Sequence, residues 1–558
     1  MVSIRRSLLL VLGVLALAAP AHAAITPGGI SFDPGTDRET GLISRSLDGG
    51  FPSGPSRNAA ISQDRQLATR VAFESDATDL VPYDGNGPTT DVFVVTRAEP
   101  YDNTGPPWRA DHTDLASTGM GGQPANGPSY LPDLDGDQLH ASHCVAFVSA
   151  ASNLVPGDTN GKPDAFVRDL RTGRIARVSV NSRGQQSNGA TYEVKVDGAC
   201  DRVAFVSDAT NLAFTRSRRK PTKPLVTTAP PAGTKQVYVR ILGGQADDKG
   251  TARTTFLASA NSRRQAANGS SFQVSFGKLG ASCPAHCGTT SGDELAFASD
   301  ATNLSPRDRN GATDVYKRQM LVPSFRSVKK ERPMRLTIEL VSAGRSGQAG
   351  NGPSSHPAIH DAGRYVAFQT DATDLLAGDN NGVTDVADAD TARHRMLWVS
   401  KSATVGEPGN GPSGDPSIAR PGSPVFFESQ ASNLQPNPVS SGGYYDKNGV
   451  QDVFFWNFVS GNTSLESRDS NNSIVGLPSR SDTGSSQRIA GPTAAPFLNP
   501  AASYYGNYVL FETSNPLVDL DVAGATFPDL LGNALKAGDM AQSDSALHQV
   551  YLRYIGPR

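Results

Sequence analysis

The stretch from Arg202 to Leu212, RVAFVSDATNL, alternates large apolar residues with small ones and ends in a run of turn-forming residues. Successive side chains of a β-strand point to opposite faces, so this pattern places Val203 and Phe205 on one face of a sheet. Similar stretches recur along the chain. They begin at Arg70, Cys144, Glu294, Tyr365 and Pro424, and a more divergent copy begins at Tyr508. Such internal repetition indicates one supersecondary unit used several times.

Each repeat contains the same series of short segments. The VAF-type strand is followed by a loop such as PGDTNGKPD and then by an apolar strand such as DAFVRDL. An outer strand such as Arg174–Val180, RIARVSV, and a glycine-rich turn lead to the next unit. Four short strands per unit, repeated around an axis, are typical of the blades of a β-propeller. We therefore predict an all-β fold, a β-propeller of four-stranded blades.

An aromatic residue follows the loop's closing aspartate by two positions in several copies. We predict that these residues pack between adjacent blades, because large aromatic side chains mostly serve cores; a stacking platform for sugar is the alternative. The residues are Phe93, Phe166, Tyr316 and Phe454.

The number of repeats predicts the number of blades. The VAF-type strand and the outer strand each occur seven times, so we expect seven blades, with six as the alternative if the copy at Tyr508 is not a blade. An outer strand near Leu42 precedes the first blade, and the last blade, which ends in QVYLRYIGPR, lacks its outer strand. We expect the N-terminal strand to complete the last blade, which closes the ring and leaves no exposed edge there.

The units VAFVSDATNL and PGDTNGKPDAFVRDL, with their ANGPS-type turns, resemble the WD40-like propeller repeats of bacterial exported proteins, in the wider family of TolB-like propellers. The resemblance covers nearly all of the chain after the first 23 residues. It implies the fold but no single function, because propellers serve binding, scaffolding and catalysis alike. The separate N-terminal domain of TolB has no counterpart here, so the resemblance does not imply a role in the Tol–Pal system.

The first 23 residues have the features of a secretory signal peptide. Arg5 and Arg6 precede an apolar run from Leu8 to Ala19, and Ala21-His22-Ala23 fits a cleavage site. We expect cleavage after Ala23, one propeller domain over residues 24–558, and a periplasmic or secreted product. The run is too short to span a bilayer comfortably, so we expect no transmembrane segment in the mature chain.

Four insertions interrupt the repeats, and two of them are basic and proline-rich. We expect these two to be solvated loops, with an anionic partner such as envelope polymer or lipid headgroups as the alternative. The insertion in the last repeat contains PDLLGNALKAG, for which we expect a short helix. The insertions lie near residues 213–235, 278–292, 317–335 and 515–548.

The chain contains four cysteines, Cys144, Cys200, Cys283 and Cys287. An exported chain permits disulfides, and four cysteines allow three pairings. We favour a local bond between Cys283 and Cys287, with Cys144 then bonded to Cys200 between neighbouring repeats. The alternative for the CPAHC segment is a metal site that uses His286 as a third ligand.

Asp-Asn-Gly loops follow five of the VAF-type strands. We expect them on the same face of the propeller as the glycine-rich turns between blades, and this loop face is the expected binding surface. Asparagine and glycine favour tight turns, and aspartate caps backbone amides, so the loops can be turns alone. Alternating oxygen ligands around a sharp bend also suit calcium. The candidate residues are Asp84, Asn86 and Asp91; Asp158, Asn160 and Asp164; Asp308, Asn310 and Asp314; Asp379, Asn381 and Asp385; and Asp446, Asn448 and Asp452.

No catalytic motif is present among the common linear signatures for hydrolases, metalloproteases or phosphate-binding loops. No histidine occupies a repeated position. We interpret the pairs His140–His143 and His356–His360 as structural or surface residues. Catalytic and cofactor-binding residues are therefore not assigned, and calcium is the one cofactor considered.

We expect an exported, monomeric, noncatalytic propeller that binds an envelope or extracellular protein or polysaccharide. The net charge of −3 argues against nucleic acid as the partner. The alternative is a hydrolase or lyase acting on a cell-surface or extracellular polymer, with acidic and histidine side chains gathered around the axis. A histidine with a carboxylate in a deep central pocket would favour the enzyme, and an axis lined by serine, threonine and backbone would favour binding.

Overall fold

The computed structural model describes most of the repeat region. By internal contacts the chain divides into Met1–Thr36 and Asp37–Arg558, and the description below concerns the second unit. The described residues are 40–64, 68–98, 110–137, 140–212, 228–242, 255–278, 294–320, 336–360, 363–402, 406–419, 424–435, 446, 451–467, 501–502, 508–513 and 549–554.

Six sheets are blades of four consecutive antiparallel strands, numbered here in chain order. Blade 1 has β2 (Ser56–Ile61), β3 (Arg70–Ser75), β4 (Asp91–Arg97) and β5 (Ala110–Leu115), and blade 2 has β6 (Ser129–Leu134), β7 (Cys144–Ser149), β8 (Asp164–Asp169) and β9 (Ile175–Arg177). Blade 3 has β10 (Thr191–Val196), β11 (Arg202–Ser207), β12 (Gln236–Ile241) and β13 (Thr255–Leu257), and blade 4 has β14 (Ser271–Phe276), β15 (Glu294–Ser299), β16 (Asp314–Met320) and β17 (Leu336–Leu340). Blade 5 has β18 (Ser354–Ile359), β19 (Tyr365–Thr370), β20 (Asp385–Asp390) and β21 (Arg395–Trp398), and blade 6 has β22 (Ser413–Ile418), β23 (Val425–Ser429), β24 (Asp452–Trp456) and β25 (Thr463–Leu465).

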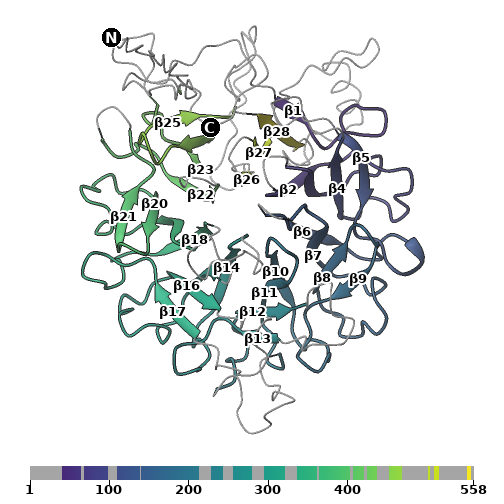
Figure 1. The fold of residues 1–558 in the computed structure, drawn as a ribbon, viewed down its shortest axis with the longest axis horizontal. Helices are drawn as coiled ribbons and strands as arrows, with labels where there is room; N and C mark the ends of the chain where they lie inside the picture. Colours follow the sequence, from purple (N-terminus) through teal and green to yellow (C-terminus); the bar gives the residue numbers. More distant parts are fainter. Residues whose placement is uncertain are drawn as a thin grey trace, which may run out of the picture. The chain divides into compact units, whose positions relative to one another are not determined.

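The remaining strands form one further four-stranded sheet, called here the closing sheet. Its order is β26 (Ala501–Ala502), β27 (Tyr508–Thr513), β28 (Gln549–Tyr554) and β1 (Thr40–Leu42). The first strand of each sheet contacts the first strand of the next, from β2 through β6, β10, β14, β18 and β22 to β26 and back to β2. Figure 1 shows these strands innermost around a common centre. The sheets therefore form the closed ring of a β-propeller.

The expected blade count needs a correction. Six blades, and not seven, are complete runs of four consecutive strands. The copy that begins at Tyr508 contributes to the composite closing sheet, whose innermost strand β26 has two residues and pairs with β27 through two residues only. The N-terminal strand β1 supplies its outer edge by pairing with β28, Leu42 opposite Tyr551. Within the described residues, the innermost strand of this last repeat is thus the shortest of the seven.

The hydrophobic core lies between neighbouring sheets. One cluster joins Phe73 and Phe93 of blade 1 to Leu510, Val550 and Leu552 of the closing sheet. Equivalent aromatic pairs stack within other blades, for example Phe147 with Phe166 in blade 2. The aromatic residues that follow the loop aspartates are buried in these clusters, as predicted. They are Phe93, Phe166, Tyr316 and Phe454.

Helical structure in the described ranges is limited to one short 3-10 turn, η1 (Met120–Gly122). Within those ranges we find no helix with the length and apolar character needed to span a membrane. The signal peptide, Cys283, Cys287, His286, Asn448, most of each insertion and the expected helix in PDLLGNALKAG lie outside the described residues.

Candidate functional site

The innermost strand of every complete blade contains a β-bulge at the same place. The pairing register shifts just after the second residue of β2, β6, β14, β18 and β22, and one residue earlier in β10. The third residue has a positive φ in five of these strands. These residues are Asn58 (52°), Leu131 (52°), Gln273 (53°), His356 (50°) and Asp415 (45°). Bulges re-aim side chains and are common beside functional sites, so this repeated feature marks the axis as the candidate site.

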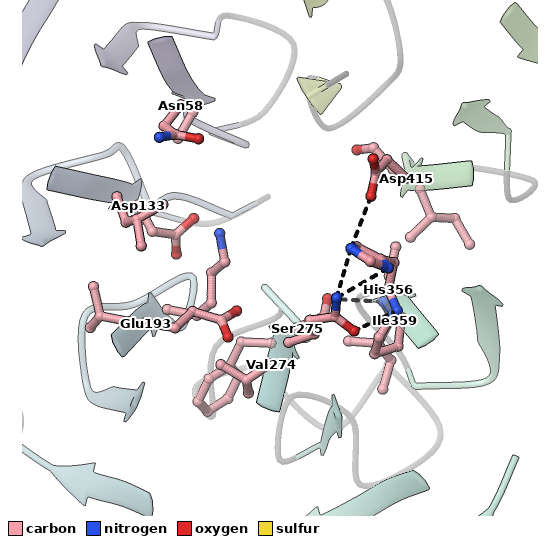
Figure 2. Close-up of a pocket in the computed structure, with 18 of the residues that line it drawn as sticks. Asn58, Asp133, Glu193, Val274, Ser275, His356, Ile359 and Asp415 are labelled. Carbon is pink, nitrogen blue, oxygen red and sulfur yellow. Dashed lines mark hydrogen bonds and ion pairs between the residues drawn. The ribbon is translucent and has the colours of Figure 1, made fainter. Parts of the chain in front are cut away.

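The bulges surround a central pocket of about 480 Å³. All six complete blades contribute to its lining through their innermost strands, and Figure 2 shows Asp133, Glu193, His356 and Asp415 around a common space. The third residues of the six strands line it: Asn58, Leu131, Glu193, Gln273, His356 and Asp415. The volume lies within the range of about 300–1,000 Å³ that is usual for small-molecule pockets.

Side chains of one blade satisfy backbone groups at the bulge of the next. The amide of Leu131 donates to Oε2 of Glu74 at 2.7 Å, and the amide of His356 donates to Oε1 of Gln273 at 3.0 Å. The amide of Asp415 donates to Oε1 of Gln369 at 3.2 Å. These bonds cross from blades 1, 4 and 5 to the blades that follow them. They hold the positive-φ residues in place around the pocket, because each freed backbone donor has a fixed partner.

One side of the pocket carries a histidine between an amide and a carboxylate. Nε2 of His356 lies 2.6 Å from the side-chain nitrogen of Gln273 and 3.3 Å from Oδ1 of Asp415. Burial lowers the pKa of His356, although the charge of Asp415 opposes this. The neutral imidazole can therefore accept a hydrogen bond from Gln273, whereas the protonated form pairs with Asp415.

The opposite side carries charged groups from blades 2, 3 and 4. Burial raises the pKa of Glu193 to about 7, a shift that Lys195 opposes and Asp133 reinforces. Nζ of Lys278 donates to Oδ2 of Asp133 at 2.6 Å and to the carbonyls of Leu134 and Val196 at 2.7 and 2.9 Å. All three ammonium protons of Lys278 therefore have acceptors, and this lysine joins the inner strands of three blades.

Sequence reasoning missed the pocket residues. His356, interpreted as structural or surface, lines the central pocket beside the carboxylate of Asp415. A signal was present in the repeat: the residue two positions after the serine of the GPS-type turn varies from copy to copy. It is Asn in SGPSRN, His in NGPSSH and Asp in NGPSGD. The bulge that turns this position inward has no signature in a single repeat.

The Asp-Asn-Gly loops lie beside the turns between blades, as expected for one shared face. In blades 1, 2, 4 and 5 the loop asparagine donates its side-chain amide to a backbone carbonyl of the turn that leads to the next blade. The pairs are Asn86 with Ala125, Asn160 with Ser187, Asn310 with Gly350 and Asn381 with Gly409. These residues therefore shape the contact between adjacent blades.

The closing aspartate of each loop begins the third strand of its blade and is buried. A serine near the end of the outer strand donates to one of its carboxylate oxygens in five blades. The pairs are Asp91 with Ser117, Asp164 with Ser179, Asp314 with Ser342, Asp385 with Ser400 and Asp452 with Ser467. In blade 6, Asp446 is also buried.

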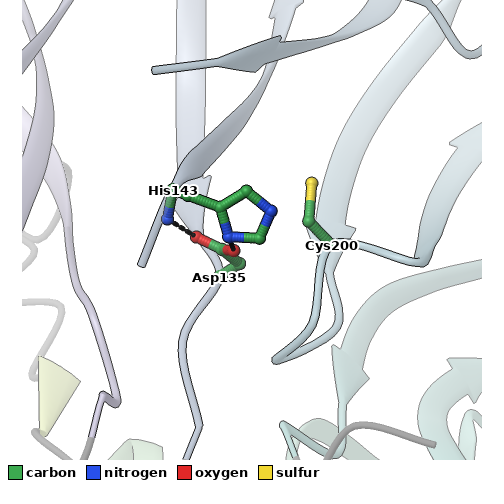
Figure 3. A group of neighbouring side chains, drawn as sticks. All are labelled: Asp135, His143 and Cys200. Atoms are coloured by element: carbon green, nitrogen blue, oxygen red, sulfur yellow. Dashed lines mark hydrogen bonds and ion pairs between the residues drawn. The ribbon is translucent and has the colours of Figure 1, made fainter. Parts of the chain in front are cut away.

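A disulfide joins Cys144 of β7 to Cys200, which precedes β11, and so links blades 2 and 3. Figure 3 shows Cys200 near His143 and Asp135, the one group of three metal-ligating residue types that we find among the described residues. The Cys200 sulfur is already bonded, and Nδ1 of His143 pairs with Oδ2 of Asp135 at 2.6 Å. This pairing raises the pKa of His143. Because the sulfur of Cys200 is in a disulfide, this group has no free thiolate for a metal.

Comparison with known proteins gives structural neighbours only. No family model matches the sequence, and no curated protein matches it. Among solved structures, the chain is similar to the Pyrococcus horikoshii acylaminoacyl peptidase, with 10% identity and a TM-score of 0.40 over 87% of this chain and 54% of that one. It is also similar to TolB from Acinetobacter baumannii, with 10% identity and a TM-score of 0.31 over 75% of this chain and 65% of that one.

A third neighbour is the β-propeller domain of the Trilobed protease from Pyrococcus furiosus, with 9% identity and a TM-score of 0.29 over 77% of this chain and 100% of that domain. The chain thus spans about half the length of the peptidase and 65% of TolB. The sheets themselves show the propeller that the repeats predicted. These likenesses concern the fold alone.

Proposed function

We propose that the protein is a noncatalytic binding scaffold that holds a neutral, hydroxyl-rich ligand, such as the end of a polysaccharide, in its central pocket. The observation that carries this proposal is the set of six bulge residues with different side chains around one pocket. A bulge needed only for packing would not require an amide, a carboxylate and an imidazole at equivalent places. The proposed site lies on the axis and differs from the loop face expected from sequence.

The charges in the pocket favour a neutral ligand. Asp133 is paired with Lys278, and the positive charge of Lys195 lowers the pKa of Glu193 against the effect of burial. Because cationic and anionic groups occur together, the pocket has no large excess of either sign. The groups that remain for a ligand are hydrogen-bond donors and acceptors, which suit hydroxyl groups.

Calorimetric titration of the full chain tests this proposal, with a panel of neutral oligosaccharides, acidic oligosaccharides and short peptides. We expect a neutral oligosaccharide to bind, and we expect Gln273→Ala and Asp415→Ala to weaken binding at least tenfold. The matched control is Tyr83→Ala, which removes an aromatic ring that is 87% exposed on the first Asp-Asn-Gly loop. Binding lost in Tyr83→Ala and kept in the pocket variants would return the site to the loop face. Binding to none of the panel would overturn the proposal.

A hydrolase or lyase is the second candidate, and one observation favours it. His356 lies 3.3 Å from Asp415 in the central pocket, and Glu193 has a pKa near neutrality. A neutral histidine and a carboxyl group with a pKa of about 7 can act as base and acid in the same pocket. Mass spectrometry of any bound oligosaccharide distinguishes the two functions. Cleavage that disappears in both Glu193→Gln and His356→Ala would establish the enzyme, whereas intact ligand supports the scaffold.

A further inference from the structure

In blade 2, the guanidinium group of Arg177 pairs with the aspartates of the Asp-Asn-Gly loop. Nη1 of Arg177 lies 3.2 Å from Oδ1 of Asp158 and 3.5 Å from Oδ2 of Asp164. The first and the closing aspartates of this loop thus face one positively charged nitrogen. The arrangement shows that a cation fits between the two carboxylates at this corner of a blade.

The other loops lack this arginine at the equivalent place. Arg177 lies opposite Phe166 in the pairing of β8 with β9, two residues after the closing aspartate. The residues in the same register are Leu115 in blade 1, Leu340 in blade 4 and Trp398 in blade 5. None of these side chains carries a charge, so the loops of blades 1, 4 and 5 keep both aspartates without the cation of blade 2.

The hydrogen bonding of the carboxylate oxygens differs between blade 2 and blades 1, 4 and 5. Buried oxygens without a hydrogen-bond partner occur on Asp84 (both), on Asp308 (Oδ1), on Asp314 (Oδ2) and on Asp379 (Oδ1), whereas Asp158 and Asp164 have none. The clearest case is blade 4, where Asp308 is 6% exposed and Asp314 is fully buried. A buried carboxylate oxygen without a hydrogen-bond partner is costly, and a second one nearby increases the cost.

In blade 4, Asp308 and Asp314 each have one carboxylate oxygen that accepts a hydrogen bond, from Tyr316 and from Ser342, and one oxygen that accepts none. Two buried carboxyl groups that oppose each other's ionisation either share a proton or bind a cation. In blade 2, Arg177 is this cation, so the repeat accommodates a positive charge beside the two aspartates.

We propose that the Asp-Asn-Gly loops of blades 1, 4 and 5 each bind a hard divalent cation such as calcium, at the place that Arg177 fills in blade 2. Carboxylate oxygens are the ligands that such cations prefer, and water completes their coordination. In blade 4 the ligands are Oδ1 of Asp308 and Oδ2 of Asp314. This site is separate from the central pocket, so it does not depend on the function proposed above.

Terbium luminescence offers a direct test on the metal-stripped full chain, because terbium replaces calcium and is excited through nearby aromatic rings. The hydroxyl of Tyr316 donates to Oδ2 of Asp308 at 2.6 Å, and the indole of Trp398 donates to Oδ1 of Asp385 at 3.2 Å. We expect terbium emission sensitised by both rings and its displacement by added calcium. Calorimetry then gives the number of calcium ions bound per chain.

Exchanging the charge between blades makes the test specific. Leu340→Arg should supply the missing cation in blade 4 and lower the number of bound calcium ions by one, while Arg177→Leu should raise it by one. Asp308→Asn provides a second variant for blade 4, with the same loss, in case Leu340→Arg does not fold. An unchanged number in Leu340→Arg and Asp308→Asn, or no terbium emission at all, would show that the paired carboxyl groups share a proton instead and would overturn the proposal.

Discussion

Asp388 is a charged residue at a position that a buried valine occupies in blades 1 to 3. It lies in β20 at the register that Val94, Val167 and Val239 occupy in blades 1 to 3. Its side chain is fully buried, and neither carboxylate oxygen has a hydrogen-bond partner. Burial raises the pKa of Asp388 to about 8, and Asp390 adds to this effect. Asp388 therefore destabilises the folded state less when it is protonated than when it is charged.

This gives a pH-dependent prediction for Asp388→Val. The folded-state pKa lies above the usual value of 3.8, so the wild type has the full stability at low pH and loses it as the pH rises toward and through about 8. We expect the variant to be more stable than the wild type at pH 8.5 by roughly 2–4 kcal/mol, and by much less at pH 5. Urea unfolding at both pH values measures this difference. Glu407→Val, which removes an exposed carboxylate, is the control. An equal effect of Asp388→Val at both pH values would contradict the argument.

Individual residues were the least predictable level of this protein. The Asp-Asn-Gly loops were found because five copies repeat them, and the structure places their asparagines and closing aspartates in contacts between strands and blades. His356 and Asp415 were missed because they differ between copies, and their proximity depends on the ring. Repeated residues in the sequence identify positions that shape every blade, whereas the pocket residues vary between blades and are not found in this way.

At the level of the element, the bulge in the innermost strands has a measurable energetic consequence. Leu131 has a φ of 52°, and the left-handed region costs a residue with a Cβ about 1–2 kcal/mol. Glycine adopts this conformation freely. A substitution to glycine there removes apolar contacts and at the same time relieves the backbone.

We predict that Leu131→Gly changes the free energy of unfolding by less than about 1 kcal/mol, because the relief of the positive φ offsets the lost contacts. Leu134 lies three residues further along the same strand, is 1% exposed and is a matched comparison. We expect Leu134→Gly to lower the free energy by about 3 kcal/mol or more. Urea unfolding of both variants provides the measurement. Equal losses in the two would mean that the bulge stores no strain at Leu131.

Strand patterns were well predicted from sequence. The VAF-type strand and the apolar strand after each Asp-Asn-Gly loop form adjacent antiparallel strands in blades 1, 2, 4, 5 and 6, for example β7 with β8. Their period-2 alternation is a local property that a single sequence displays directly. The bulge escaped prediction because its positive-φ residues include leucine and histidine, which give no local signal for that conformation.

At the level of the whole molecule, stability depends on the closing sheet. β1 pairs with β28, the amide of Ile43 donates to the carbonyl of Val550 at 2.9 Å, and the hydroxyl of Ser44 donates to Gln549 at 2.7 Å. Leu42 of β1 is 3% exposed. A short strand therefore completes the sheet that closes the ring.

We predict that Leu42→Pro lowers the free energy of unfolding by about 3 kcal/mol or more, because the variant loses a core side chain and the proline ring restricts φ in a strand of only three residues. The urea midpoint provides the measurement. Leu47→Ala, at a position that is 60% exposed, serves as the control and should unfold like the wild type. If Leu42→Pro also unfolds at the wild-type urea concentration, β1 does not hold the ring.

The propeller could be inferred from sequence because every repeat has the same pattern of short strands and turns. The number of complete blades could not be predicted in the same way, because the last repeat keeps its VAF-type strand while its innermost strand has only two residues in the part of the chain that the structure describes. The central pocket was also beyond reach. It is formed by six strands that are distant in sequence, and only the closed ring brings them together.

The pairing of β1 with β28 also sets the order in which the fold is completed during synthesis. Ser44 and Gln549 are 505 positions apart, and at about 5–20 residues per second roughly half a minute to two minutes of translation separates them. Blades made of consecutive strands can form as they emerge, whereas the closing sheet must wait for its last strand. During that interval β1 is a strand without its partner, and an unpaired strand edge is prone to aggregation. The contact that closes the ring is thus the latest to form.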